Sequence, residues 1–499
     1  MTLLSITYGV FLLSLLGIYW LVDARSLRLW VILVASLIFY SSLQLQYIPL
    51  LLLLMLATFF VGRAIATPMN WNVSNEEWQF AQQDWNRRRL RLLWLGISLN
   101  VLLLLGFKYI LPFLSQSEGR VIGAATSTAS LGWLDTRIIA PLGLSYFVFE
   151  CIAYLVDVYR GAPATSNMLE FSAYKLFFAK LLSGPITRFH PIDAQFQALR
   201  VPSVIQVSDG LWLIAWGAVK KLLLADHIAI LVNLSFSNLD RAGSGDLWLA
   251  TFAYGLQLYL DFSGYVDVAL GTALLLGISL PQNFNFPYFS TSIADFWRRW
   301  HMTLGDWLRN YLYFPLGGSR KGLARTCLNL IIVMLIAGIW HNPGWGFVVW
   351  GALHGIALAT HRLTSEVSKQ YPWFKQWWNS IPGTVSAWAI TQFSVFFAWL
   401  FFRLPNPQDF GLVLQRLWGH VADVQFAQKV YIEELGMNRP QITLALWGLV
   451  ALMAGTYAFR RGLKVQLNWP VKILLVPIFI YLAWLLAPAE SLPYIYFDF

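Results

Sequence analysis

Long apolar runs separated by short polar stretches follow one another along the whole chain. Several runs are shorter than the roughly 20 residues of a full membrane crossing, so they indicate tilted, broken or re-entrant helices. The pattern predicts an all-α, polytopic membrane protein with roughly eleven tilted transmembrane helices plus re-entrant and interfacial helices. The candidate spans are 3–22, 29–43, 47–62, 92–107, 138–156, 247–260, 265–280, 326–340, 344–360, 384–402, 441–459 and 473–487.

Two apolar stretches, 172–184 and 208–225, each contain two lysines. Because charge at membrane depth is costly, we expect these stretches to form horizontal or half-inserted helices. No internal repeat and no soluble domain of useful size interrupts the pattern, which favours a single membrane domain. The longest polar insertion, about 64–91, is expected to form a cytoplasmic loop. The expected domain covers 1–499, with N-terminal helices in 1–115, a core in 138–365 and C-terminal helices in 384–499.

Composition narrows the class further. Apolar residues make up 58% of the chain and charged residues 12%, against about 45–50% and about 25% in soluble domains, which excludes a disordered chain. Two cysteines, Cys151 and Cys327, fit neither a disulfide framework nor a cysteine metal site. The net charge of +10 would suggest nucleic acid in a soluble protein. Here we attribute it to basic cytoplasmic loops, and we expect no nucleic-acid partner.

Loop charge predicts the orientation. Arg25 follows the first span, a run of three arginines at 87–89 lies after the third, and Arg460 and Arg461 precede the last. The positive-inside rule places these loops in the cytoplasm, with the N-terminus and the tail 488–499 outside. The N-terminal run has no basic region and no A-x-A-like cleavage site, so we interpret it as a retained span.

The segment 281–322 carries candidate chemistry. At about 100° per residue, residues 293–311 form an amphipathic helix with Asp295, Arg298 and Arg299 on the polar side. We expect Asp295 to pair with one of the arginines. His301 lies at the seam between the faces, where it can reach an apolar tunnel and a polar entrance. The alternatives are a flat interfacial helix whose arginines touch lipid phosphates and a structural, hydrogen-bonded histidine.

A second candidate, His341, ends an apolar run and is followed by Asn342, Pro343 and Gly344. An ionisable group at membrane depth usually lines a cavity, and the helix break exposes backbone groups that need polar surroundings. Histidine is also suited to proton transfer near neutral pH. With Trp340 beside it, His341 is our candidate catalytic residue, the alternative being a structural role. His354, 13 residues on, need not share a face with it.

The remaining polar features are weaker. Arg320 and Lys321 form a basic loop without Walker spacing, either a topological anchor or a dock for the phosphates of a nucleotide-bearing donor. Asp261 and Asp267 point in different directions on a helix, so we expect no metal site there. Four histidines near span ends or polar loops are interpreted as structural: His190, His227, His361 and His420.

Ordered sequence blocks from about residue 100 to 365 resemble the membrane-bound O-acyltransferase family, in particular its bacterial alginate O-acetyltransferase branch. The blocks are 141–146, 154–160, 183–188, 220–226, 258–265, 283–288, 296–301, 311–322 and 340–341. The resemblance implies tilted helices around a central tunnel that links cytoplasm and outer side. It also implies that His341 is catalytic and that His301 is the second characteristic polar position. Asn342 departs from the family pattern, which has glycine there.

The resemblance implies transfer of an acetyl group from cytoplasmic acetyl-CoA toward an extracytoplasmic polysaccharide hydroxyl, in the bacterial inner membrane. His341 would act as general base or accept the acyl group, and His301 would orient the thioester. Arg299, Arg320, Lys321 and Trp340 are the expected substrate-binding residues. The implied partners are acyl-CoA, the lipid bilayer and the polysaccharide or an SGNH-type acetyltransferase; no metal or resident cofactor is expected.

Three alternatives stay open. One is D-alanyl or longer acyl transfer from a carrier-protein thioester to a cell-envelope polymer. The others are a transporter of acyl or lipid-linked intermediates, which would be expected to show inverted repeats, and a non-catalytic scaffold.

Overall fold

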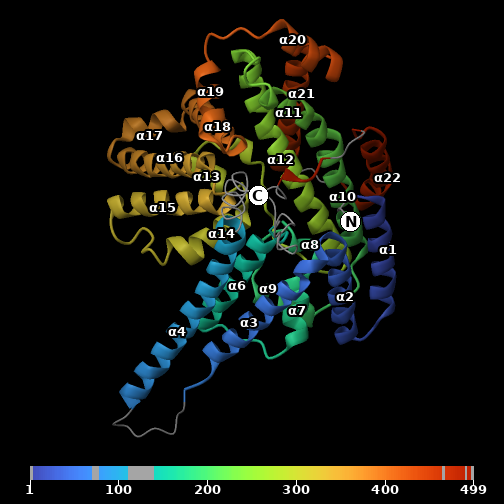
Figure 1. Cartoon of the computed structure of the whole chain (residues 1–499), viewed down its shortest axis with the longest axis vertical. Helices are drawn as coiled ribbons and strands as arrows, with labels where there is room; N and C mark the ends of the chain where they lie inside the picture. Colours follow the sequence, from blue (N-terminus) through green and yellow to red (C-terminus); the bar gives the residue numbers. More distant parts are fainter. Residues whose placement is uncertain (1–3, 70–77, 111–139, 464–466, 489–491, 496–499) are drawn as a thin grey trace, which may run out of the picture. The chain divides into compact units, whose positions relative to one another are not determined.

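The computed structural model describes residues 4–69, 78–110, 140–463, 467–488 and 492–495 (Figure 1). Every regular element in these ranges is helical, which confirms the all-α prediction. Contacts group the chain into two compact units. The first contains Met1–Pro202 and Thr272–Pro281, and the second contains Ser203–Gly271 and Gln282–Phe499.

The described residues of the first unit contain eight α-helices, together with a 3-10 turn at Leu45–Tyr47 and a π-helical stretch at Gly106–Ile110. They are α1 (Ile6–Leu21), α2 (Arg25–Gln44), α3 (Ile48–Ala66), α4 (Trp78–Leu105), α6 (Leu144–Tyr159), α7 (Met168–Leu176), α8 (Phe178–Leu181) and α9 (Phe189–Gln197). Glycines allow α3 and α4 to approach α6 closely. A Cβ on Gly62 would lie 2.6 Å from the Tyr154 ring, and one on Gly96 would lie 2.5 Å from Leu155.

Helix α4 begins well before the predicted span 92–107, so the interpretation of that polar stretch as a loop up to residue 91 is wrong. Hydrogen bonds hold the part of α4 that precedes residue 92, and a hydropathy profile does not detect such bonds. The Arg89 guanidinium donates to the carbonyl of Tyr159 at 2.6 Å and to that of Ile65 at 3.1 Å. It also lies 4.4 Å above the Trp85 ring. One arginine therefore ties the end of α3 and the end of α6 to the polar turn of α4.

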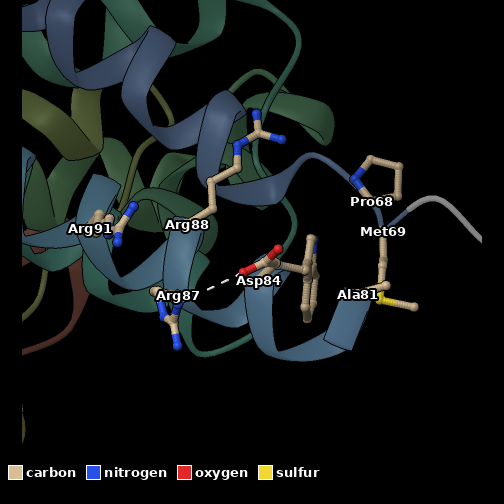
Figure 2. A pocket seen from close by; sticks show the side chains of 8 residues that line it. Pro68, Met69, Ala81, Asp84, Arg87, Arg88 and Arg91 are labelled. Carbon is tan, nitrogen blue, oxygen red and sulfur yellow. Dashed lines mark ion pairs between the residues drawn. The ribbon is translucent and has the colours of Figure 1, made fainter. Parts of the chain in front are cut away.

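A cavity of about 530 Å³ lies beside the start of α4. Figure 2 shows Asp84 pointing toward Arg87, with which it forms an ion pair at 3.9 Å, whereas Arg88 and Arg91 point in other directions. These guanidinium groups do not converge on one point. Their spread is typical of arginines at the edge of a bilayer rather than of a built phosphate site.

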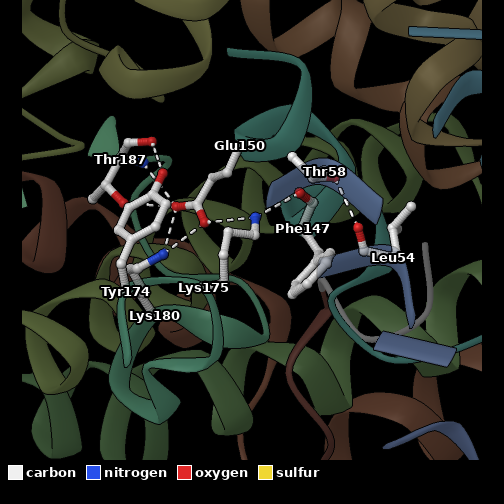
Figure 3. Close-up of polar contacts among 8 residues, drawn as sticks. All are labelled: Leu54, Thr58, Phe147, Glu150, Tyr174, Lys175, Lys180 and Thr187. Carbon is white, nitrogen blue, oxygen red and sulfur yellow. Dashed lines mark hydrogen bonds and ion pairs between the residues drawn. The ribbon is translucent and has the colours of Figure 1, made fainter. Parts of the chain in front are cut away.

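The lysine-bearing stretch 172–184 forms α7 and α8, and both lysines are buried against Glu150 of α6 (Figure 3). Lys180 Nζ donates to the two Glu150 oxygens at 2.7 and 2.6 Å, and Lys175 Nζ lies 3.3 Å from Oε2. Thr187 donates to Glu150 Oε1 from its backbone N–H and its hydroxyl. Buried charges are tolerated here because each one has a partner.

Where the structure describes it, the second unit consists mainly of thirteen α-helices. They are α10 (Val204–Ala218), α11 (Asp226–Ser237), α12 (Ser244–Leu275, whose last four residues count with the first unit), α13 (Ile293–Trp297), α14 (Met302–Leu308), α15 (Leu323–His341), α16 (Trp345–Gln370), α17 (Pro372–Asn379), α18 (Ile381–Arg403), α19 (Pro407–Arg416), α20 (Val424–Ala427), α21 (Arg439–Tyr457) and α22 (Trp469–Leu485). Stretches of π-helix cover Val219–Ala225, Arg309–Tyr313, Gln428–Glu434 and Ala458–Gly462.

Helix α12 joins the predicted spans 247–260 and 265–280 into one element, so the predicted boundary between them is wrong. The polar residues between the two apolar runs do not end the helix, because Asp261 is neutralised by Lys221 at 2.7 Å. Lys220 pairs separately with Asp267 at 2.6 Å. The prediction that the two aspartates point in different directions is confirmed.

Within the described residues, six helical stretches are long and apolar enough to cross a membrane. They are Arg25–Ala66, Trp78–Ile110, Ser244–Leu275, Leu323–His341, Ile381–Arg403 and Arg439–Gly462. The shorter helices Ile6–Leu21 and Trp469–Leu485 are also apolar. Large apolar side chains point outward on several of them, as expected of a surface that faces lipid. The multi-pass prediction is confirmed, whereas the predicted number of eleven spans is not.

Candidate active site

His341 is the last residue of α15, and its side chain is 3% exposed. Asn342 then turns to an extended conformation, and its Oδ1 accepts from the Gly344 N–H at 3.0 Å. The predicted helix break after His341 is therefore confirmed. Aromatic rings surround the imidazole: centroid distances are 4.5 Å to Trp340, 5.1 Å to Phe402 and 5.4 Å to Trp350.

Close packing of α15 against α16 fixes the position of His341. A Cβ on Gly338 would collide with the carbonyl oxygen of Phe347, and one on Gly351 would lie 2.5 Å from that of Met334. Small residues at such contacts let two helices approach with their backbones nearly touching. The side chains that flank the contact, His341 and Trp350, are thereby brought face to edge.

A cavity of about 270 Å³ is lined by Asn342, the residue that follows this histidine, and we call it the Arg403 cavity. Phe347 and Phe402 line it and also pack against the imidazole. The Arg403 guanidinium donates to Asn233 Oδ1 at 3.0 Å, which holds the charged group at the wall. The lining residues are Asn233, Tyr254, Gln257, Asn342, Phe347, Phe402, Arg403, Pro405, Leu492, Pro493 and Ile495. The mixed lining suits a polar, hydroxyl-bearing ligand.

One wall of the Arg403 cavity comes from the last described residues of the chain. Lys221 Nζ donates to the Pro493 carbonyl at 3.1 Å, and the Ile495 N–H donates to Asp261 Oδ2 at 2.9 Å. Lys221 also pairs with Asp226 at 2.8 Å. A buried ion cluster therefore holds the tail against the site, a contact over more than 200 residues that no local pattern predicts.

His301 lies at a break between two short helices, so the predicted continuous amphipathic helix over 293–311 is wrong. Its backbone is left-handed, with φ 41°, and its side chain is fully buried. Asn283, 18 residues earlier, explains the break. Its Oδ1 accepts from the Thr303 N–H at 3.1 Å and the Thr303 hydroxyl at 2.9 Å, and it lies 3.1 Å from His301 Nδ1. These bonds cap α14 and replace the helical bonds that a continuous helix would make.

The environment of His301 keeps its imidazole neutral, since burial lowers its pKa to about 3. A neutral ring has one donor and one acceptor nitrogen. Ring contacts link it to the other histidine: from His301 through Phe262, Phe284, Trp300, Trp399 and Phe402 to His341, with centroid distances of 4.9, 5.0, 5.1, 5.0, 5.4 and 5.1 Å. Both histidines thus border one continuous aromatic core of the second unit.

The sequence profile of the membrane-bound O-acyltransferase family matches residues 35–403, a range that contains both histidines and Arg403. The chain belongs to this family. It is 31% identical over 510 residues to the probable alginate O-acetylase AlgI of Pseudomonas putida, covering 98% of both chains. It is 36% identical over 402 residues to that of Pseudomonas aeruginosa, covering 80% of this chain and 71% of the relative. The peptidoglycan O-acetyltransferase of Helicobacter pylori is 33% identical over 423 residues, with coverage of 79% and 74%.

In this O-acyltransferase, the predicted substrate-binding residues lie at separate places. Arg299 is half-buried and pairs with Asp295 at 2.8 Å, and Arg298 pairs with the same carboxylate at 3.4 Å, so the predicted local pairing is confirmed. Arg320 and Lys321 are exposed just before the first residue of α15. A helix of that length rises about 27 Å, so the basic loop and His341 stand at opposite ends of α15.

His354 is the residue that sequence reasoning left unassigned. It is 2% exposed, and its ring lies 4.9 Å from that of Trp350, which also contacts His341. The 13-residue spacing between the histidines spans a helix break, which makes helical phase meaningless across it. The usable signal was the four-residue spacing of Trp350 and His354, which places both on one face of α16.

Proposed function

We propose that this O-acyltransferase moves an acetyl group from cytoplasmic acetyl-CoA toward a hydroxyl of an extracytoplasmic polysaccharide, in the bacterial inner membrane. The observation that carries the proposal is the placement of His341. It ends α15 beside the Arg403 cavity, and the opposite end of the same helix carries the basic loop of Arg320 and Lys321. Charge at one end and a hydroxyl-compatible cavity at the other suit a donor with phosphates and an acceptor with hydroxyls.

In the proposed mechanism an imidazole nitrogen of His341 takes the proton of the attacking hydroxyl. The hydroxyl oxygen forms a bond to the thioester carbonyl carbon, the carbon–sulfur bond breaks, and the departing thiolate receives the proton from His341. His301, as a neutral imidazole, would orient the thioester or donate to the developing oxyanion. The surrounding rings exclude water and so protect the thioester from hydrolysis.

A two-step route uses the same residue. The His341 nitrogen would attack the thioester carbonyl carbon, the carbon–sulfur bond would break, and the imidazole N–H proton would pass to the leaving thiolate. A hydroxyl in the Arg403 cavity would then attack the acetyl carbon, the carbon–nitrogen bond would break, and the hydroxyl proton would return to the imidazole. We propose that the acceptor side is served by a separate SGNH-type acetyltransferase or by the polysaccharide itself. The names of the relatives describe acetylation of alginate and of peptidoglycan, which supports a polysaccharide acceptor.

The decisive experiment measures acetyl transfer from radiolabelled acetyl-CoA by membranes that contain equal amounts of each variant. His341→Ala should lower the rate by about 10²–10⁴-fold, as expected for loss of a general base. His301→Ala should also lower it. His420→Ala, which removes an exposed histidine bonded to the Trp418 carbonyl, is the matched control and should stay at the native rate. Native activity in His341→Ala would refute the assignment.

A further inference from the structure

An aromatic box surrounds His354 in the second unit. Its other members are Trp350 on the same helix, Trp297 at the end of α13 and Trp399 on α18. Their ring centroids lie 4.9, 5.2 and 6.1 Å from that of the imidazole. Trp297 and Trp399 also contact Trp350, at 5.8 and 5.9 Å. We call these four residues the His354 box.

Each ring of the His354 box carries a buried nitrogen that has no hydrogen-bond partner in the described part of the chain. The atoms are Nε2 of His354 and the indole nitrogens of Trp297, Trp350 and Trp399. Leaving a buried polar group without a partner destabilises the folded state, so four such groups on adjacent rings call for an explanation. An indole N–H can only donate. The box therefore contains three unpartnered donors, which match the acceptor oxygens of a ligand.

The position of the box relates it to the reaction. Trp350 contacts the imidazoles of both His354 and His341, at 4.9 and 5.4 Å. The Arg403 cavity adjoins His341 through Phe347 and Phe402. Along α16 the order is thus Phe347, Trp350, His354 and then the charged end with Arg362 and Lys369. The positive-inside rule puts that charged end in the cytoplasm, so the box lies on the cytoplasmic side of His341.

We propose that the His354 box binds the pantetheine arm of the acyl-thioester donor, an inference that rests on the proposed function. The arm bears two amide groups, whose carbonyl oxygens accept from the indole N–H groups. Nε2 of His354 pairs with an amide as donor or acceptor, according to its tautomer. The methylene groups of the arm pack on the aromatic faces. Acetyl-CoA and a carrier-protein thioester share this arm, so the box serves either donor.

The test removes single N–H groups by replacing each indole with the smaller phenyl ring, which keeps an aromatic side chain at the position. Trp350→Phe, Trp399→Phe and Trp297→Phe are made in the purified protein in lipid nanodiscs. Binding of a non-reactive thioether analogue of acetyl-CoA is then measured by calorimetry. Each loss of one hydrogen bond should weaken binding about five- to tenfold. Trp388→Phe is the matched control, because its indole N–H is already bonded to the Tyr288 carbonyl at 3.0 Å, and it should bind as the native protein does.

Two further ligands identify what the box recognises. Binding of 3′,5′-ADP, which lacks the arm, should not change in any variant. If a carrier protein loaded with the thioether binds, its affinity should fall by the same factor as that of the CoA analogue. In steady-state assays the Trp→Phe variants should raise KM for the donor and leave kcat within about twofold. If Trp350→Phe and Trp399→Phe fold and bind the analogue with native affinity, the proposal is overturned, and water is the partner of the indole N–H groups. Trp297→Phe, at a half-buried ring, keeps the test valid if the other two variants unfold.

The outcome is separable from that of the proposed function. His341→Ala should bind the analogue with native affinity and lose transfer. If His341→Ala retains transfer while the Trp→Phe variants lose analogue binding, the catalytic assignment fails and the binding site stands.

Discussion

Replacing Glu150 with glutamine would remove the negative charge from a buried cluster that contains two lysines. In the native protein the carboxylate accepts from Lys180 at 2.7 and 2.6 Å, and Lys175 lies 3.3 Å away. The glutamate, Lys175 and Lys180 are 4%, 0% and 3% exposed, so water cannot replace the lost charge. The substitution keeps the shape of the side chain, and the change in stability therefore reports electrostatics.

Removing one partner of a buried ion pair costs about 3–5 kcal/mol, because the other charge is left buried and uncompensated. The lysine can reduce this cost by giving up its proton. Burial already lowers the pKa of Lys180 to about 8, and loss of the carboxylate would lower it further. In the unfolded chain Lys180 keeps its proton up to its ordinary pKa of about 10.4, whereas the folded variant holds this lysine neutral from a lower pH. Between these two pKa values the unfolded state binds more protons, so the stability of Glu150→Gln should rise with pH there.

Thermal unfolding of the purified protein in detergent measures the effect. In a Cys327→Ser background, a thiol-reactive dye reports exposure of Cys151, which is fully buried beside Glu150 on α6. We expect the unfolding temperature of Glu150→Gln to fall by at least about 5 °C. Glu150→Gln/Lys180→Met restores the native net charge of the cluster and should recover part of the loss. Glu366→Gln, which removes surface pairings with Arg362 at 2.7 Å and Lys369 at 3.0 Å, is the control and should leave the unfolding temperature close to that of the native protein. An unchanged unfolding temperature for Glu150→Gln, or a double variant no more stable than the single one, would refute this account.

Two further predictions follow from the packing around the histidines. Asn283→Ala removes the oxygen that caps α14 and contacts His301, so the acetyl-transfer rate should fall at least about tenfold while Asn438→Ala, which removes the cap of α21, should not change it. An equal loss of acetyl transfer in both variants would mean that the loss of any helix cap lowers the rate, and that the contact of Asn283 with His301 has no specific role. Gly351→Ala forces a Cβ to within 2.5 Å of the Met334 carbonyl and should destabilise the protein by about 1–3 kcal/mol and lower transfer. A Cβ added at Gly448 would meet nothing within 4 Å, so Gly448→Ala should change neither stability nor the transfer rate in the same assays. Native stability and activity of Gly351→Ala would show that α15 and α16 can separate without harm.

Much of the fold followed from local sequence alone. In a bilayer the backbone must satisfy its own hydrogen bonds, so long apolar runs become helices whatever their neighbours are. Proline and glycine after His341 end α15 because both disfavour the continuation of a helix. Asp295 meets Arg298 and Arg299 because three to four residues make one helical turn. These features depend on residues within a few positions of one another, and hydropathy and periodicity report such relations.

The tertiary structure decided what depends on distant partners. Asn283 breaks the helix at His301, and Lys221 neutralises Asp261 so that α12 continues through a polar stretch. His354 gains its aromatic neighbours from α13 and α18, elements about 50 residues away on either side in sequence. Helical phase carries no information across a break or between elements. The assembly around the histidines is therefore fixed by packing that only the folded chain contains.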